Sequence, residues 1–459
     1  MDITEYFNID YLKELFQSKI KKSKSKGIDK VSVIDFELNL DNNLEIIVRK
    51  ILDGTYRFSP YLEILKLKGR KKHPRIISIP TIRDKIVLLT IKEILHSKFE
   101  DSVNRKLPNN YIKDIKRYLI VNPGEKYYLK LDLEKFYDTI SHEIILSKLE
   151  LNGIPEPILK LVEKAISNLT VPQNTKKNNY KNFENKIGVP QGLSISNILA
   201  QIYLIEFDKT IYKRKYFYQR YVDDILLLNS SEISSYRVKN FTEEINKLEL
   251  TINKDKTEQN SLNEVPFSFL GYLIQSNNIS VSEKNIEIFI RRIAGKITWF
   301  KVGYSNIEKR PEYLKNDLEK FKIVFIEELN DMITGLVANN KNYGWLFYFS
   351  EITDIDLLFK LDKIIAHFFV NLDPFENRRP SSLKKLVRTY FAIKHKQSNY
   401  INNYDNLDTI RKKRNFLIFR GQISSVKNYS DREIENFFIN YQNRQIKKIE
   451  QGLGYTYFN

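Results

Sequence analysis

Two adjacent acids, Asp223 and Asp224, constrain the fold of this chain more than any other feature of its sequence. They stand between an aromatic-rich run at 216–221 and an apolar run at 225–228. Such a pattern predicts a strand, a tight turn and a second strand, with both acids at the bend. Because Asp is a common turn residue, the pair taken alone favours an ordinary hairpin turn.

A third acid, Asp132, changes this interpretation because it ends another strand-like run, at 127–131. Carboxyl groups with an ordinary pKa near ~3.9 are all ionised at neutral pH, and two such charges ~4 Å apart repel by roughly 1 kcal/mol in water. Without a cation, one of three neighbouring carboxylates should hold a proton. Two Mg²⁺ ions would remove this conflict, one activating a primer 3′-hydroxyl and the other binding the oxygens of a nucleoside triphosphate.

Three further segments bear on function. Alternation at 62–68 and 75–80 predicts a β-hairpin, and six cations between Lys66 and Arg75 suit it to holding phosphates. Residues 188–200 form a loop that opens into an apolar helix; small residues there would let a base pair or sugar approach the backbone, although an ordinary helix start is the alternative. A basic loop at 22–30 is either a phosphate contact or a solvated linker.

Helical periodicity accounts for most of the remaining chain. Before the acidic hairpin it predicts helices at 84–99, 141–151 and 157–168, and after it a helix at 242–250. A second hairpin is expected around 267–274, and beyond Ser282 the pattern is helical almost to the end. The helices predicted there are 284–302, 312–338, 355–371, 381–395 and 430–450.

The charge of the chain narrows the choice of partners. A net charge of +18 predicts a polyanionic partner, with nucleic acid the first candidate. Residues 376–459 contain seventeen Lys and Arg against seven Asp and Glu, so this region either contacts nucleic acid or carries solvated helix faces. Absence of Cys excludes disulfides and thiolate zinc sites. No apolar run approaches the ~18 residues of a membrane span, and we expect a cytoplasmic protein without a membrane partner.

The order of these motifs resembles that of reverse transcriptases. Asp132 with Phe136 and Tyr137 is similar to the first catalytic block of that family, and 221–224 to its YxDD hairpin. The remaining similar blocks are 75–80 with Asp84 and Lys85 (fingers), 188–200 (PQG), 253–257 (Lys block) and 269–272 (primer grip). Together the blocks extend over residues 20–290.

This resemblance implies a right-hand polymerase of the α+β class. It would have fingers, a palm with an antiparallel sheet and a helical thumb, followed by an α-helical C-terminal domain. The expected boundaries are 1–282 for fingers and palm, 283–375 for the thumb and 376–459 for the basic C-terminal domain.

The resemblance also implies roles for individual residues. Asp132, Asp223 and Asp224, with the Leu133 carbonyl, would hold two Mg²⁺ ions. Tyr137 would lie under the incoming sugar and favour dNTPs over rNTPs, with core packing as the alternative. Arg75, with Lys66 or Lys68, would contact the triphosphate, and Gln191 and Gly192 would line the nascent base pair. Lys256 would donate a proton to pyrophosphate, with a solvent-facing position as the alternative. The primer would be contacted by Phe269, Leu270, Gly271 and Tyr272.

The implied activity is RNA-directed DNA synthesis from dNTPs, with an RNA template or a non-coding RNA as partner and DNA as product. Residues 339–348 look like those of bacterial abortive-infection and antiphage-defence enzymes. Because some enzymes of that group oligomerise, the resemblance allows a homo- or hetero-oligomer. Template-independent or protein-primed synthesis, for instance from Tyr455 or Tyr457, is also open, as is a catalytically idle RNA-binding scaffold. Only His367 and His395 lie in the C-terminal third, so we expect no metal-dependent nuclease there.

Overall fold

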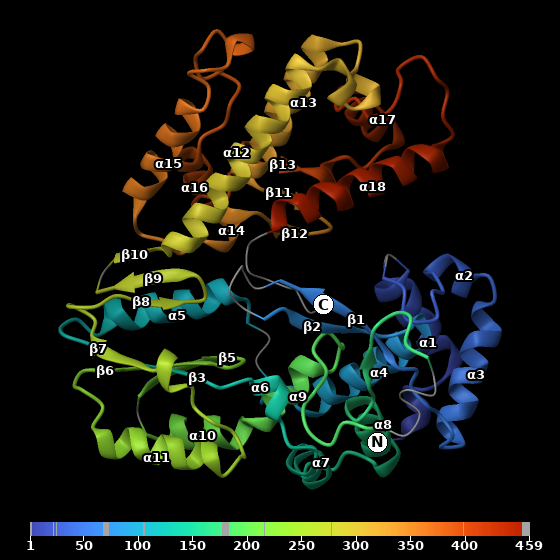
Figure 1. The fold of residues 1–459 in the computed structure, drawn as a ribbon, viewed down its shortest axis with the longest axis vertical. Coiled ribbons are helices and arrows are strands. Elements are labelled where there is room, and N and C mark those ends of the chain that lie inside the picture. Colours follow the sequence, from blue (N-terminus) through green and yellow to red (C-terminus); the bar gives the residue numbers. More distant parts are fainter. Residues whose placement is uncertain are drawn as a thin grey trace. The chain divides into compact units, whose positions relative to one another are not determined.

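The protein is described here by a computed structural model, which covers residues 2–21, 23, 25–67, 73–103, 106–176, 183–214, 216–276, 278–397 and 399–451. These residues form two compact units (Figure 1). Unit 1 contains the described residues up to 103 and 126–261, and unit 2 contains 106–125 and 262–451. This division reflects packing, and the three functional regions expected from the sequence remain a prediction.

The central sheet of unit 1 is antiparallel and has the strand order β5-β6-β3-β7. Its middle strand β6 is buried along residues 225–228. Burial on both faces explains why this strand is a continuous apolar run rather than an alternating one. The strands are β3 (Tyr127–Asp132), β5 (Phe217–Tyr221), β6 (Asp224–Asn229) and β7 (Glu258–Ser261).

A second sheet of unit 1 contains the predicted basic hairpin. Strands β1 (Tyr61–Lys66) and β2 (Arg75–Ile79) pair antiparallel, and β4 (Thr170–Val171) adds to β1 in parallel. The hairpin at 62–80 is therefore confirmed. Its loop at 68–72, which includes Lys68, lies outside the described residues.

Helices of unit 1 pack against a shared apolar core, some with one face and α4 with its whole circumference along residues 86–91. In α3, for example, Leu40, Leu44, Ile47 and Ile51 recur at helical spacing and are all buried. The helix predicted at 242–250 was placed too late, because α11 already begins at Ser235. The helices are α1 (Ile9–Leu15), α2 (Val33–Glu37), α3 (Leu40–Leu52), α4 (Ile82–Lys98), α6 (Phe136–Thr139), α7 (His142–Leu151), α8 (Glu156–Ile166), α9 (Ser196–Tyr203), α10 (Ile205–Tyr212) and α11 (Ser235–Asn246).

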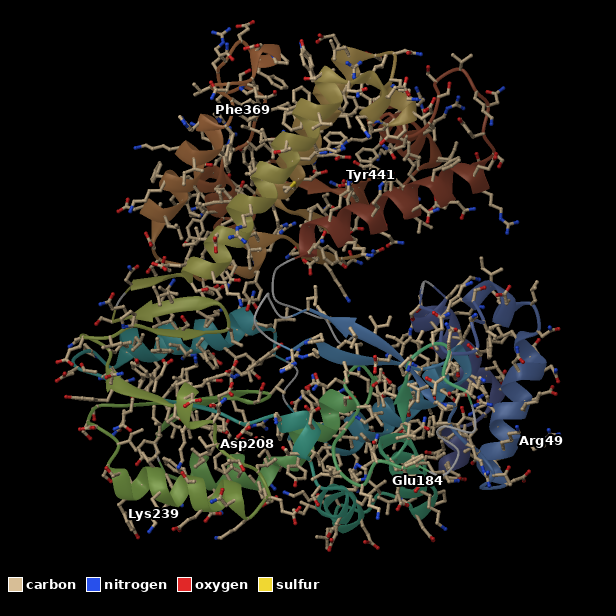
Figure 2. All side chains as sticks on the ribbon, viewed as in Figure 1. Arg49, Glu184, Asp208, Lys239, Phe369 and Tyr441 are labelled. Atoms are coloured by element: carbon tan, nitrogen blue, oxygen red, sulfur yellow. The ribbon has the colours of Figure 1, made fainter. Side chains whose placement is uncertain are left out.

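Unit 2 is mainly helical around an aromatic interior. Phe369 and Tyr441, which Figure 2 labels, are 0% and 2% exposed. Its first sheet has the order β10-β9-β8. The elements are α5 (Pro108–Val121), β8 (Phe267–Phe269), β9 (Tyr272–Gln275), β10 (Asn278–Val281), α12 (Glu283–Ser305), α13 (Leu318–Thr334), α14 (Trp345–Tyr348), α15 (Ile355–His367), α16 (Leu386–Lys394), α17 (Ile410–Phe419) and α18 (Asp431–Glu450).

The helix predicted at 312–338 is wrong at both ends. It begins at Leu318, and it ends at Thr334 because Gly335 takes a positive φ of 71°. A second small sheet follows, with β11 (Leu336–Ala338) between β12 (Lys341–Tyr343) and β13 (Asn402–Asn403).

The turn of this β11–β12 hairpin is built by two asparagines. Asn339 and Asn340 have φ of 52° and 56°, as a tight hairpin turn requires. Their N–H groups donate to the Asp405 carboxylate at 2.6 and 2.8 Å. Part of the segment that resembles the defence enzymes, 339–348, therefore has a folding role.

The architecture agrees with the α+β class predicted from the sequence, with an antiparallel sheet in unit 1 and a largely helical C-terminal part. Within the described ranges, every helix is too short or too polar to span a lipid bilayer.

Candidate active site

Pairing of two central strands brings the three acids together. In the antiparallel register of β3 and β6, Asp132 stands opposite Asp224. Asp223 lies in the two-residue turn between β5 and β6, where Val222 adopts a φ of 58°. Residues far apart in sequence thus meet at one end of the sheet, on rigid elements that suit a catalytic site.

The electrostatics of this end of the sheet are those of crowded carboxylates. Burial, followed by the charge of Asp223, raises the pKa of Asp224 to about 6. Burial and the charge of Asp132 also raise the pKa of Asp223. Both shifts disfavour the ionised form, so a cation beside these carboxylates would stabilise it.

One lysine partly offsets this deficit. The Lys256 ammonium lies 2.8 Å from Oδ2 of Asp132, although its side chain is 57% exposed. It is carried by a 3₁₀ turn, Lys254–Lys256, which is anchored because the Asn253 N–H donates to the Asp132 carbonyl at 2.8 Å. Leu133, the next residue, is buried and bridged to Ile252. The predicted lysine block is therefore in direct contact with the acidic site.

A partly buried ion pair holds the turn that presents Asp223. The Arg220 guanidinium donates to the Val222 carbonyl at 3.0 Å and pairs with Asp208 on α10 at 2.5 Å. Figure 2 labels Asp208. We had assigned no role to either residue from the sequence. The sequence signal for this ion pair was an arginine at the end of a strand predicted to be buried, because a charge in such a place needs a partner and the preceding helix offers an acid.

The glycine-bounded loop at 188–200 is fixed against two other elements. The Gln191 carbonyl accepts from the Ser78 N–H at 2.7 Å, and the Gln191 side chain donates to Asp138 at 3.3 Å. A Cβ at Gly192, whose φ is +112°, would come within 2.8 Å of the Ser78 carbonyl oxygen. Only glycine allows this loop to pack so closely on β2.

Tyr137 and Arg75 lie near Asp223. Burial and the charge of Asp223 raise the pKa of the Tyr137 phenol, while Arg75 acts in the opposite direction. The Nε atom of Arg75 is buried and has no hydrogen-bond partner among the described residues. Lys66, opposite Arg75 in the hairpin, has a pKa lowered by burial and by the charge of Arg75. These cations are therefore placed to receive an anion.

The acidic site has the donor chemistry of a divalent-cation site without being a complete one. Carboxylate oxygens are the ligands that Mg²⁺ prefers, and their repulsion here would be relieved by a cation. Nevertheless, no three His, Asp or Glu side chains within the described ranges form a ready-made metal-binding group. Further ligands, such as phosphate oxygens, would have to complete the shell.

Comparison with known protein families identifies the part of the chain that contains this site. Residues 65–274 match the family described as reverse transcriptase (RNA-dependent DNA polymerase). This range, slightly under half of the chain, is thus identified as a reverse transcriptase domain. The matched range includes the three acids, the 188–200 loop, Lys256 and the segment at 269–272.

Relatives of this reverse transcriptase domain share low identity with it. The group II intron-encoded protein LtrA of Lactococcus lactis is 25% identical over 46% of this chain and 35% of its own length. The putative COX1/OXI3 intron 1 protein of Saccharomyces cerevisiae is 24% identical over 53% and 35%. The chain thus spans about a third of the length of these curated relatives. Among solved structures, apo telomerase from Candida tropicalis is similar with a TM-score of 0.41 and 14% identity, over 95% of this chain and 75% of that one.

The predicted primer-grip segment of the reverse transcriptase domain lies in unit 2. Leu270 and Gly271 form the β8–β9 turn with φ of 50° and 81°. The Tyr348 hydroxyl donates to the Leu270 carbonyl at 2.6 Å, and the Tyr272 hydroxyl donates to the Tyr348 carbonyl. Phe269 is buried. The hairpin is therefore well supported within its own unit, and its contact with a primer remains a prediction.

Proposed function

We propose that this protein is an RNA-directed DNA polymerase that adds dNTPs to a 3′-hydroxyl group. The observation that carries the proposal is the meeting of Asp132, Asp223 and Asp224 at one end of the β3–β6 pair, with raised pKa values at two of them. A fold gains nothing in stability from such repulsion, whereas phosphoryl transfer needs a site of this charge.

Two divalent ions, held by the three carboxylates and the Leu133 carbonyl, would supply electrostatic stabilisation of in-line displacement. The chain's own residues would do the rest. Lys256, which is paired with Asp132 at 2.8 Å, would donate a proton to the leaving pyrophosphate. Arg220 would keep Asp223 in place through the Val222 carbonyl.

The nucleotide would be held by the hairpin and the loop that pack together beside the acids. Arg75 has a buried Nε that no described residue hydrogen-bonds, and a triphosphate oxygen would satisfy it. Lys66 would add a second cation. Gln191 and Gly192, fixed to Ser78, would line the base pair.

The decisive experiment measures incorporation of labelled dNTPs on a primed RNA template with Mg²⁺. Asp223→Asn should reduce the rate by about a thousandfold or more, because it removes a charge required only in the reaction. Glu232→Gln, a surface acid on the loop after β6, is the matched control and should leave the rate unchanged. Incorporation that survives Asp223→Asn would contradict the proposal. Incorporation that survives RNase treatment in the absence of added template would favour untemplated synthesis.

A second experiment addresses the choice of sugar. Tyr137 is half-buried and lies beside Asp223, where its ring would clash with a 2′-hydroxyl. Tyr137→Ala should therefore raise the use of rNTPs relative to dNTPs by about tenfold or more, whereas Tyr137→Phe should retain the discrimination. If the alanine variant keeps its selectivity, the ring has a packing role instead.

For the biological role we propose antiphage defence together with a non-coding RNA. The support is the resemblance of residues 339–348 to bacterial defence enzymes. Phage should form fewer plaques on cells that express the protein than on cells that express Asp223→Asn. RNA recovered with the protein should be a defined species. Equal plaque numbers with both forms over a broad phage panel would remove this role.

A further inference from the structure

Helix α5 carries a basic groove that the proposed chemistry does not use. One face of the helix, including Tyr111, Ile112 and Ile115, is buried. The opposite face lines a cavity of about 600 Å³ together with Glu351, which follows α14 in unit 2. The lining residues on the helix side are Lys106, Asn110, Lys113, Asp114, Lys116, Arg117, Ile120 and Val121.

The acids of this groove already have cationic partners. Asp114 pairs with Lys106 at 2.8 Å, and Glu351 pairs with Lys394 on α16 at 3.4 Å. Three other cations, Lys113, Lys116 and Arg117, have no ion-pair partner in the described part of the chain. The groove therefore has an excess of positive charge that its own acids do not neutralise.

The surroundings of Lys116 show the same excess. Burial, together with the charge of Lys394, lowers the pKa of its ammonium group, although Glu351 acts in the opposite direction. An anion in the groove would counter both effects. Positions 116 and 117 stand three and four residues after 113, so both are neighbours of Lys113 on the helix surface, whereas 116 and 117 are adjacent in sequence. The three cations therefore lie within about one turn of α5, on the side that lines the groove.

Apolar residues continue the groove at the end of α5. Ile120 and Val121 line the groove and are each 68% exposed. Cations on one turn of the helix beside exposed apolar surface on the next turn fit a strand that offers both phosphates and the faces of its bases. A compact anion such as a free triphosphate would use the cations and leave this apolar surface uncovered.

We infer that the α5 groove binds the phosphodiester backbone of single-stranded RNA, through Lys113, Lys116 and Arg117. The choice of RNA rests on the proposed function, in which RNA is the template or a bound non-coding partner. Only five residues separate α5 from β3, the strand that ends at Asp132. The inference thus assigns a strand-holding site to the helix that directly precedes the catalytic strand in sequence.

The test measures binding of a labelled oligouridine about 15 nucleotides long, by fluorescence anisotropy, without dNTPs or divalent ions. The triple variant K113Q/K116Q/R117Q should bind about 10- to 100-fold more weakly at moderate salt. The slope of log affinity against log salt should become shallower by about 2, because three phosphate contacts are lost. The variant K113R/K116R, which keeps the charges, should bind as the parent does.

A charge-matched control separates a site from general attraction. Lys160, Lys239 and Lys247 are exposed lysines of unit 1, and their triple Gln variant changes the net charge equally. Equal weakening by both triple variants, or none by the α5 variant, would overturn the inference. Efficient competition by a mononucleotide would also overturn the inference, as would weaker binding of single-stranded DNA without weaker binding of RNA. Equal weakening of RNA binding and DNA binding by the α5 variant would support contacts to phosphates. The fluorescence of Trp299 and Trp345 verifies that unit 2 of the triple variant is folded. If it is not, the single variants Lys113→Gln and Arg117→Gln replace the triple variant in the binding assay.

Because this assay is independent of catalysis, its failure leaves the polymerase proposal intact. Conversely, the parent protein could show no polymerase activity while the α5 substitutions still weaken its RNA binding. That result would contradict the polymerase proposal and support RNA binding in the α5 groove.

Discussion

The two units bury charge in opposite ways. In unit 1, Asp223 and Asp224 share one end of a sheet with Asp132, and their pKa values are raised. In unit 2, a buried carboxylate, Asp331, is surrounded by donors. It pairs with Arg420 at 3.1 Å, and both side chains are almost completely buried.

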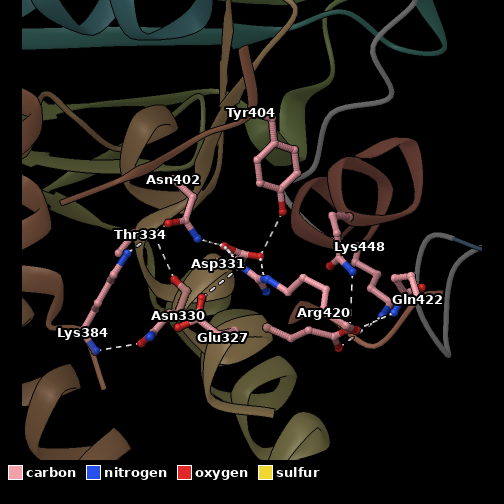
Figure 3. A network of polar contacts seen from close by, with 12 residues as sticks. Glu327, Asn330, Asp331, Thr334, Lys384, Asn402, Tyr404, Arg420, Gln422 and Lys448 are labelled. Atoms are coloured by element: carbon pink, nitrogen blue, oxygen red, sulfur yellow. Dashed lines mark hydrogen bonds and ion pairs between the residues drawn. The ribbon is translucent and has the colours of Figure 1, made fainter. Parts of the chain in front are cut away.

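Figure 3 shows the donors that surround Asp331 in unit 2, although Nε and Nη1 of Arg420 form no hydrogen bond among the described residues. Asp331 also accepts hydrogen bonds from Asn402 at 2.5 Å and from Tyr404 at 3.2 Å. Arg420 reaches Glu327 at 3.1 Å as well. The network thus connects α13 with β13 and with the segment that follows α17.

A neighbouring pair, Glu328 and Lys296, behaves in the same way. Burial would raise the pKa of the Glu328 carboxyl, but the Lys296 ammonium at 2.5 Å holds it at about 2. Lys448 on α18 adds a second cation at 3.5 Å. Here the ionised carboxylate is the stable form, in contrast to Asp224.

The difference separates a structural cluster from a binding site. Opposite charges that are paired on burial hold elements together, and they need no ligand. Like charges that are buried together raise the free energy of the free protein, and this cost is recovered only when a cation binds. Between these two clusters the pKa shifts have opposite signs: the pKa of Glu328, which is paired with cations, is lowered, and that of Asp224, which is crowded by other acids, is raised.

The largest effect should come from breaking the unit 2 network. Arg420→Met leaves Asp331 buried without its cation, and we expect a loss of about 3–5 kcal/mol in unfolding free energy. Both tryptophans, Trp299 and Trp345, lie in unit 2, so their fluorescence during urea unfolding reports this unit. Replacing Asp331 with Leu in the same chain should recover part of the loss. A single variant as stable as the parent would show that the network is not structural.

A smaller effect of opposite sign is expected at Asp224. Its pKa is raised from 3.8 to about 6, so the neutral form is favoured in the fold and stability is lost as pH rises through about 6. In the absence of divalent ions, Asp224→Asn should therefore stabilise unit 1 by about 2 kcal/mol at pH 8 and not at all near pH 4. Hydrogen exchange of the β3 and β6 amides measures the change.

The matched variant in the same unit is Asp208→Asn. Asp208 is paired with Arg220, so losing its charge should destabilise the sheet at pH 8. If both variants shift stability in the same direction, the comparison between paired and crowded acids fails.

The sequence was sufficient for the local elements that carry the three acids. Strand patterns predicted a strand that ends at Asp132 and a turn at Asp223 and Asp224, whereas the pairing of β3 with β6, which brings these sites together, was a hypothesis that the family resemblance supported. The sequence was also sufficient for the basic hairpin, whose alternation is bounded by Gly and Pro.

Other features depend on tertiary contacts that periodicity does not record. Strands β11 and β13 are too short to show alternation, and only Gly335 and the Asn339–Asn340 pair could have revealed the turn. The contact of Lys256 with Asp132 joins residues distant in sequence, so it could be supposed only by resemblance. We made no prediction for α5, whose residues precede β3 in the chain but pack within unit 2.

The smallest effect should come from adding Mg²⁺ to the resting protein. Ion binding to the crowded acids of unit 1 should stabilise it by about 1.4 kcal/mol at ten times the dissociation constant, and unit 2 should not respond. Hydrogen exchange of β3 and β6 is the measurement for unit 1, and tryptophan fluorescence is that for unit 2. Asp132→Asn should abolish the response. Lys256→Gln should enhance it, because the ammonium at 2.8 Å competes with a metal ion for the same Asp132 oxygen. A weaker Mg²⁺ response in Lys256→Gln would mean that the lysine supports the metal site instead of substituting for it.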